Sequence, residues 1–250
     1  MTNLVLSPYQ AFFIDETEKL WMVLKDGRTR FVKNTPAFSN ISANYTYICG
    51  VEFNGEHTFV ERLTFGFTDE DTKPLFHVFG YCYYPTITEE KHPRLALLKA
   101  DLLNKSGTAD LIVYKQARTK FHPQFQMMAQ IVPPVWDNAL LYYVTAKGQL
   151  VRTNGKTGER LADKALLFAL NKAKDAIAYY DGETIYQVSL ETGNTHKTMA
   201  FGVTALGYNA DNELLFATEN GDSYIIQKYN RQTGEVEPVA RSAVAVKMIL

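Results

Sequence analysis

Three segments in the second half of the chain share one hairpin pattern: an alternating strand, a polar turn that contains Thr-Gly, and a second strand. They are 151–159, 186–194 and 227–235. Alternating segments on either side of a polar, glycine-containing turn are typical of β-hairpins. The repetition therefore predicts an all-β chain built from similar units, and it indicates no particular chemistry.

Each of these hairpins belongs to a larger unit. A further tight turn precedes it, at 146–148, 181–182 and 220–221. Asp181-Gly182 and Asn220-Gly221 are residue pairs that accept positive φ in a hairpin turn. An additional apolar strand is predicted before each unit, at 127–132, 165–170 and 201–208. Each unit is therefore predicted to contain four strands in a meander.

Units of four short strands that recur about every 40 residues are typical of β-propeller blades. The first half of the chain is less regular, with strands predicted at 45–53, 57–67, 75–84, 95–103 and 109–114. We predict six four-stranded antiparallel blades for the 250 residues, with five and seven as alternatives.

The two ends of the chain are predicted to complete one blade. After the last full unit, 243–249 forms an apolar strand with no hairpin of its own. The N-terminal segment supplies three strands, at 10–14, 20–24 and 29–32. One strand and three strands make a blade, so we predict a single β-propeller domain that spans residues 1–250.

The turns resemble the Asp-X-X-Thr-Gly segments of quinoprotein-type and other bacterial propeller repeats, most closely at Leu190-Glu191-Thr192-Gly193. The quinoprotein repeat carries a docking tryptophan shortly after that glycine. The corresponding positions here hold Arg160, His196 and Val236. The resemblance thus implies a propeller, while a quinone cofactor has no support and we predict no cofactor.

Composition narrows the classes of partner and compartment. The 26 Lys and Arg residues nearly balance the 27 Asp and Glu residues, which argues against nucleic acid as a partner. No segment has the basic start of a signal peptide or the apolar length of a spanning helix, so we expect no membrane contact and a cytoplasmic location. Cys49 and Cys82 are expected to be reduced, half-buried thiols, with one disulfide as the alternative.

Sequence motifs for metal sites and common catalytic sites are absent. The five histidines form no close metal-binding pair. Asp69-Glu70-Asp71 lacks the alternating spacing of a calcium loop and is expected to be a solvated turn. No Gly-X-Ser-X-Gly elbow, phosphate loop or dinucleotide fingerprint occurs. We predict no metal site and favour a protein that is not an enzyme, although catalytic side chains brought together from several blades remain an alternative.

Two segments are predicted to form recognition loops. In the first, Tyr83 and Tyr84 precede a mixed-charge loop that holds His92 and Arg94, and tyrosine offers contact area and a polar tip at little entropic cost. We take these four residues as candidate partner contacts, with a tyrosine-rich strand and a long connection as the alternative. The second segment, 115–125, is predicted as an irregular loop that carries basic and aromatic residues.

These observations favour a non-enzymatic interaction module that presents loops to a protein or peptide partner. The alternatives are a propeller hydrolase or lyase, or a small-ligand binder, with a site at the mouth of the channel. A further alternative is a structural role within a larger complex.

Overall fold

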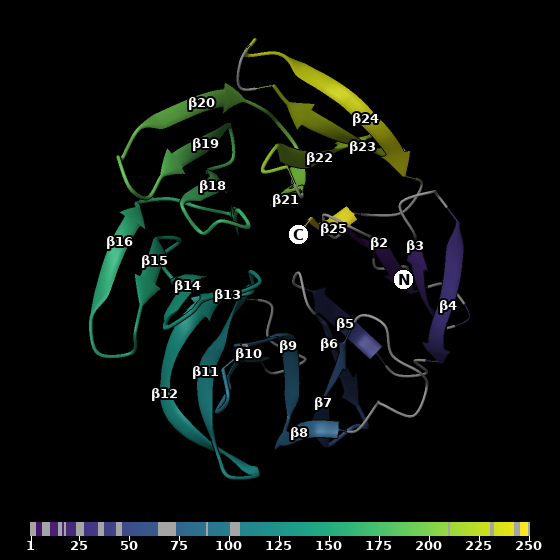
Figure 1. Ribbon diagram of the computed structural model, residues 1–250, viewed down its shortest axis with the longest axis vertical. Coiled ribbons are helices and arrows are strands. Elements are labelled where there is room, and N and C mark those ends of the chain that lie inside the picture. The colour runs from purple at the N-terminus through teal and green to yellow at the C-terminus, as the bar shows by residue number, and fades with distance from the viewer. Residues whose placement is uncertain are drawn as a thin grey trace. The chain divides into compact units, whose positions relative to one another are not determined.

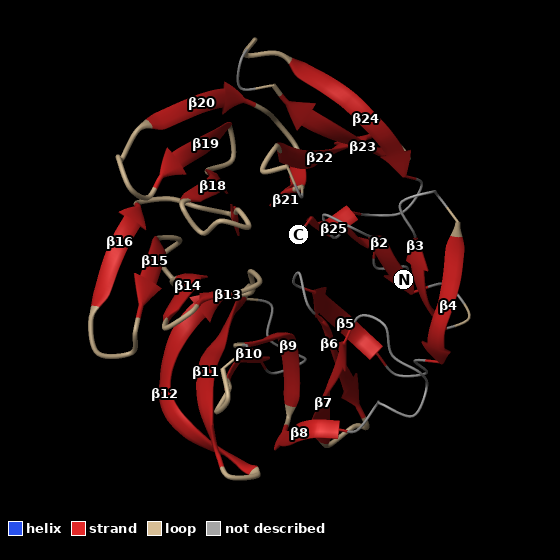
Figure 2. Ribbon diagram, viewed as in Figure 1, coloured by secondary structure: helices blue, strands red, loops and turns tan. Residues whose placement is uncertain are grey.

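The computed structural model of the protein contains strands and loops and no helix among the residues that it describes (Figure 2). These residues are 4–6, 11–14, 17, 19–23, 28–34, 38–43, 47–64, 74–88, 90–100, 106–209, 211–230, 233–242 and 246–249. The acidic triplet at 69–71 lies outside them.

The described strands form six sheets, and the chain divides into two compact units. One unit is Ala37–Lys164, and the other combines Met1–Pro36 with Ala165–Leu250. Each unit contains three sheets (Figure 1). We call them the middle unit and the terminal unit.

The middle unit contains three four-stranded antiparallel sheets. The first consists of β5 (Phe38–Ala43), β6 (Tyr47–Phe53), β7 (His57–Thr64) and β8 (Pro74–Phe79). The second consists of β9 (Tyr81–Ile87), β10 (Arg94–Ala100), β11 (Thr108–Ala117) and β12 (Lys120–Gln130). The third consists of β13 (Val135–Asp137), β14 (Leu140–Val144), β15 (Leu150–Thr153) and β16 (Gly158–Ala162).

The terminal unit contains two four-stranded sheets and one of five strands. The first consists of β17 (Leu167–Leu170), β18 (Ala176–Tyr180), β19 (Thr184–Ser189) and β20 (Thr195–Met199). The second consists of β21 (Val203–Tyr208), β22 (Leu214–Asn220), β23 (Ser223–Tyr229) and β24 (Val236–Ser242). The third has the order β25-β1-β2-β3-β4, with β25 (Val246–Ile249), β1 (Leu4–Leu6), β2 (Ala11–Ile14), β3 (Lys19–Val23) and β4 (Thr29–Asn34).

Strands from both ends of the chain share this five-stranded sheet, because β25 pairs in parallel with β1. Residues 246–249 of the predicted strand 243–249 therefore share a sheet with the three predicted N-terminal strands, and β1 is an additional strand between them. β1 was missed because three residues are too few to show a period.

Where side-chain burial is described, it decreases from the first two strands of a sheet to the last. In β10 and β14, four consecutive residues are buried, Leu95 to Leu98 and Leu141 to Val144. Strands buried on both faces have this continuous apolar character. The last strands, such as β16 and β20, are mostly exposed.

Within each unit, the buried first strands pack against neighbouring sheets. β9 contacts β5, β6 and β7, and it also contacts β13. β21 contacts β17 and β18 on one side and β25 on the other (Figure 1). Sheets that are stacked through their first strands in chain order have the arrangement of consecutive propeller blades.

The glycine turns fall into two kinds. Gly193 (φ 73°) and Gly234 (φ 76°) close the β19–β20 and β23–β24 turns, as the Thr-Gly repeat predicts. In the repeat at 151–159, Gly155 takes the positive φ (90°), and Gly158 is already the first residue of β16. The difference follows from Gly155 itself, because the corresponding positions of the other two repeats hold Leu190 and Arg231, which do not favour positive φ. The Oδ1 of Asn154 accepts the N–H groups of Lys156 and Thr157 in this turn.

Three predicted boundaries are wrong. Segment 75–84 is two strands in different sheets, separated at Gly80 (φ 92°). Segment 127–132 does not begin the next unit: its residues through Gln130 pair with β11 in the preceding sheet, and β13 begins the new sheet. The predicted loop 115–125 is a hairpin, with its turn at Arg118 (φ 57°) and Pro123 at a register shift in an edge strand, where proline is tolerated.

Neither cysteine forms a disulfide and both are buried, as expected for reduced thiols. Cys49 is 1% exposed and Cys82 is fully buried, so both lie deeper than the half-buried positions predicted from sequence. Burial raises the pKa of the Cys82 thiol to about 11. A buried thiol of this kind behaves as a small apolar side chain.

Candidate functional site

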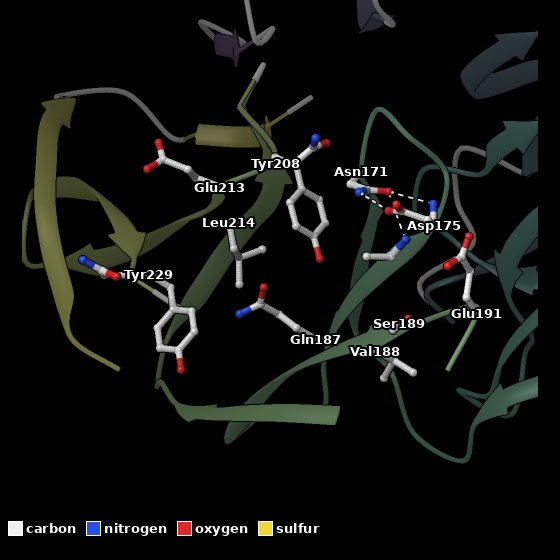
Figure 3. Close-up of a pocket in the computed structure, with 13 residues that line it drawn as sticks. Asn171, Asp175, Gln187, Val188, Ser189, Glu191, Tyr208, Glu213, Leu214 and Tyr229 are labelled. Atoms are coloured by element: carbon white, nitrogen blue, oxygen red, sulfur yellow. Dashed lines mark hydrogen bonds between the residues drawn. The ribbon is translucent and has the colours of Figure 1, made fainter. Parts of the chain in front are cut away.

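A groove of about 520 Å³ lies between two sheets of the terminal unit, β17–β20 and β21–β24 (Figure 3). One bank consists of the β17–β18 loop and the end of β19 with its following turn, including Asn171, Asp175, Gln187, Ser189 and Glu191. The other consists of the β21–β22 loop and the ends of β21 and β23, including Tyr208, Asn212, Glu213, Leu214 and Tyr229. Polar residues of strand ends and turns therefore form most of the lining.

Asn171 holds the β17–β18 loop in one shape. Its Oδ1 accepts hydrogen bonds from the backbone N–H groups of Asp175 (3.1 Å) and Ala176 (3.0 Å). Its Nδ2 donates to Oδ1 of Asp175 at 2.6 Å (Figure 3). Lys174 takes the positive φ (62°) that closes the turn. One asparagine thus fixes both the loop backbone and the carboxylate that faces the groove.

Asn209 holds the β21–β22 loop in the same way. Its Oδ1 accepts from the backbone N–H groups of Asp211 (3.0 Å) and Glu213 (2.8 Å), and its Nδ2 donates to Oε2 of Glu213 at 2.6 Å. Asn212 has the positive φ (59°) here. The two sheets therefore repeat one device, an asparagine that orients the carboxylate four residues later.

The turns after β19 and β23 also correspond to each other. Ser189 Oγ accepts the backbone N–H of Thr192 at 3.2 Å, and Asn230 Oδ1 accepts that of Thr233 at 3.3 Å. The backbone N–H of Leu190 donates to the carbonyl oxygen of Asp175 at 2.7 Å. This last bond places the β19–β20 turn, which carries Glu191, beside the β17–β18 loop.

The lining is acidic. It contains three carboxylates, Asp175, Glu191 and Glu213, and no lysine or arginine. Lys228 lies 3.2 Å from Oε1 of Glu213. The hydrogen bond from Asn209, together with Lys228, lowers the pKa of Glu213. Glu213 is thus compensated within the chain, whereas Asp175 and Glu191 form no ion pair with any residue that the structure describes.

Larger side chains line the deeper part of the groove. Tyr208 is 2% exposed and Tyr229 is 9% exposed. Gln187 extends from β19 toward Leu214 and Tyr229 (Figure 3). Its amide Nε2 is buried and donates to no described residue. A buried donor without a partner is uncommon, because leaving it unsatisfied costs about 1–3 kcal/mol.

The four residues singled out from the sequence lie in the middle unit and not in this groove. Tyr83 and Tyr84 belong to β9, and both are partly buried against an apolar cluster. The ring centroids of Tyr81 and Tyr83 are 4.7 Å apart, and those of Tyr83 and Tyr84 are 6.1 Å apart. Burial raises the pKa of both Tyr83 and Tyr84. His92 is exposed in the β9–β10 connection.

Arg94, at the start of β10, is bound within the chain. Its guanidinium donates to the carbonyl oxygens of Asn138 and Ala139, each at 3.0 Å, and pairs with Glu90. It also stacks over the ring of Trp136, 4.9 Å from the centroid. These contacts connect the sheet of β9–β12 to the β13–β14 turn. A partner role for the four residues stays a prediction, and for Arg94 the structure adds a stabilising role.

The sequence reasoning missed the groove, although a signal was present. The same pattern follows the first strand of each of the two sheets: Asn171-X-X-X-Asp175 after β17 and Asn209-X-X-X-Glu213 after β21. Aligning the repeats by these positions, in addition to the Thr-Gly turns, would have brought the two asparagines into register. That the two loops face one groove could not be read from the sequence, since it depends on how the sheets pack.

Other kinds of site find no basis in the described part of the chain. It contains no group of three or more His, Cys, Asp or Glu residues that could hold a metal ion. None of its elements is a helix with the length and apolar character needed to cross a bilayer.

Comparison with known proteins supports the fold. No protein-family model matches the chain, and no curated protein matches its sequence. Among solved structures, Hsv2 from Kluyveromyces lactis aligns with a TM-score of 0.65 and 11% identity over 94% of this chain and 77% of its own. Saccharomyces cerevisiae Sqt1 aligns with a TM-score of 0.57 and 12% identity over 97% and 73%, respectively. Both are β-propeller proteins, so the chain has a propeller-like fold.

A third similar structure is the Pyrococcus horikoshii acylaminoacyl peptidase, with a TM-score of 0.61 and 11% identity. The alignment covers 95% of this chain and 44% of the peptidase. At such identities the likeness concerns the fold alone and transfers no activity.

The contacts of Arg94 lead to a prediction about stability. Arg94→Ala removes the donors to two carbonyl oxygens and the stacking on Trp136, and we expect a loss of about 1–3 kcal/mol. For a chain of this size that corresponds to a fall in Tm of roughly 3–10 °C, measured by differential scanning fluorimetry. Arg160→Ala is the control, because Arg160 makes an exposed ion pair with Asp163. An Arg94→Ala protein as stable as the control would show that these contacts contribute nothing.

The lowered pKa of Glu213 leads to a prediction about pH. A carboxylate whose pKa is lower in the folded state stabilises the protein above its unfolded pKa, and this contribution is lost as the pH falls through the folded value. We expect Glu213→Gln to reduce the free energy of unfolding at neutral pH by about 1 kcal/mol or less, since the side chain is partly exposed to solvent. The difference in free energy of unfolding between wild type and Glu213→Gln should shrink below pH 4.5, the ordinary pKa of glutamate. It should vanish once Glu213 is protonated in the folded protein.

Urea unfolding of both proteins from about pH 7 to about pH 3 measures this difference. Glu219→Gln is a suitable control, because Glu219 is an exposed residue on β22 of the same sheet. A difference between wild type and Glu213→Gln that stays constant over the whole range would contradict the assignment.

Proposed function

We propose that the two units are the halves of one six-bladed β-propeller and that the protein is a non-enzymatic module that binds a protein or peptide partner. The six sheets and their succession along the chain support the blade count. The pairing of β25 with β1 supports closure of the ring through the sheet that contains both chain ends.

The groove of the terminal unit is the observation that carries the binding role. Its two banks are loops whose backbones are fixed by asparagine side chains before any partner arrives. Binding to loops that are already ordered avoids much of the entropic cost of association. The groove also combines amide, carboxylate and tyrosine side chains, which suits the alternating donors and acceptors of an extended peptide.

A small-ligand site is the second candidate function. The groove volume of about 520 Å³ lies in the range of roughly 300–1,000 Å³ found for small-molecule pockets. The acidic lining disfavours anionic ligands such as nucleotides in either case, because their phosphates would be repelled.

Selection from a random displayed-peptide library on the purified protein tests the interaction role. Ala176→Phe serves to obstruct the groove, because Ala176 lines it. Ala173→Phe is the matched control, since Ala173 is an exposed residue of the same loop outside the lining. We expect enriched peptides to bind wild type and Ala173→Phe equally and to lose at least about tenfold in affinity for Ala176→Phe, a loss of about 1.4 kcal/mol.

Melting curves establish that both variants fold, and hydrogen exchange provides an independent readout in wild type. A bound peptide should protect amides in 171–176 and 187–191. Failure to enrich any peptide, or peptides that bind all three proteins equally without this protection, would refute the proposal. Small fragments that raise the Tm of wild type but not of Ala176→Phe would then favour the second candidate.

A further inference from the structure

We propose that the groove selects a partner segment carrying an arginine or lysine, whose cationic group lies against Asp175 and Glu191. This inference rests on the proposed peptide-binding function and specifies the chemistry of the peptide.

Uncompensated negative charge on one bank is the first argument. The Leu190–Asp175 backbone hydrogen bond brings the turn that carries Glu191 beside the loop that carries Asp175. Figure 3 shows both carboxylates on this bank and Glu213 on the opposite one. Glu213 is paired with Lys228, whereas the other two have no ionic partner in the described part of the chain. A cation bound between them would relieve their mutual repulsion.

The lysines of the β17–β18 loop lie outside the lining of the groove. Lys172 and Lys174 follow Asn171 closely in sequence, but neither lines the groove. Each makes an interaction within the chain. The negative charge of the bank is therefore available to a partner.

Orientation of the acceptor oxygens is the second argument. Asn171 donates to Oδ1 of Asp175, and this bond restrains the side chain. A restrained carboxylate loses little entropy when it accepts a further, charge-assisted hydrogen bond. Glu191 is exposed at the turn, so its side chain can reach the same cation.

Gln187 gives a third, independent argument for a peptide rather than a free cation. Its buried Nε2 lacks an acceptor, and the terminal torsion of glutamine is soft, so the amide can turn toward the groove. A main-chain carbonyl of a bound segment is a suitable acceptor. An apolar segment would leave this amide and both carboxylates desolvated without partners, and an acidic segment would be repelled.

Positional-scanning heptapeptide pools test the inference. Each pool has one central residue, Arg, Lys, citrulline, Leu or Glu, and all other positions are randomised. Citrulline has the shape of arginine without its charge. We expect the Arg and Lys pools to bind wild type at least about tenfold more tightly than the citrulline pool, a preference typical of a charge-assisted contact.

The protein variants separate charge from shape. Asp175→Asn and Glu191→Gln keep the size of each side chain and remove its charge, and together they should abolish the preference for Arg over citrulline. Glu183→Gln is the control, because Glu183 is an exposed residue of the turn just before β19, at the end of the strand away from Glu191. It should leave the preference unchanged.

The outcomes distinguish this inference from the proposed function. If all pools bind equally and Ala176→Phe blocks them, the groove binds peptides but the preference for a basic residue is refuted. A preference for Leu or Glu, or an Arg preference that survives in the double variant, also refutes it. If no pool binds, the proposed function fails as well.

Discussion

Burial of strands on both faces, as in β10 and β14, is the constraint on which the rest of the structure depends. β10 and β14 each carry four consecutive buried residues, and β21 contacts a neighbouring sheet on either side. Such strands cannot alternate between core and solvent. Each sheet must therefore be covered by others, and the exposed last strands, such as β16 and β20, form the outer edges.

The same constraint produces the groove. When two sheets pack through their buried strands, the turns at corresponding strand ends are brought close to each other. In the terminal unit these turns carry Asn171 with Asp175 and Asn209 with Glu213, which repeat one hydrogen-bonding arrangement. A stabilising turn motif that is repeated in adjacent sheets thus becomes two ordered banks of a polar groove.

Much of the fold could be predicted because turns and strand patterns are local. Local sequence encodes two of the three Thr-Gly turns, the Asp181-Gly182 turn and β25, which lies within the predicted strand 243–249. Segment 75–84 was misread because both of its strands are apolar and one glycine separates them. Segment 115–125 was misread because its basic residues and Pro123 suggested a loop, whereas an exposed edge strand accepts both.

The candidate site was harder to predict, since it depends on packing between sheets. The sequence predicts partner contacts where side chains common in interfaces lie close together along the chain, as at Tyr83, Tyr84, His92 and Arg94. Arg94 shows the limit of that reasoning, because its carbonyl acceptors come from a turn more than 40 residues away. The groove likewise combines residues from four separate segments.

A crystal structure of the protein in complex with an arginine-containing heptapeptide tests the central claim most directly. The account predicts a peptide in the groove between β17–β20 and β21–β24, with its guanidinium within hydrogen-bonding distance of Asp175 or Glu191. A peptide bound on another surface, or one whose arginine points to solvent while the groove contacts other side chains, would contradict it.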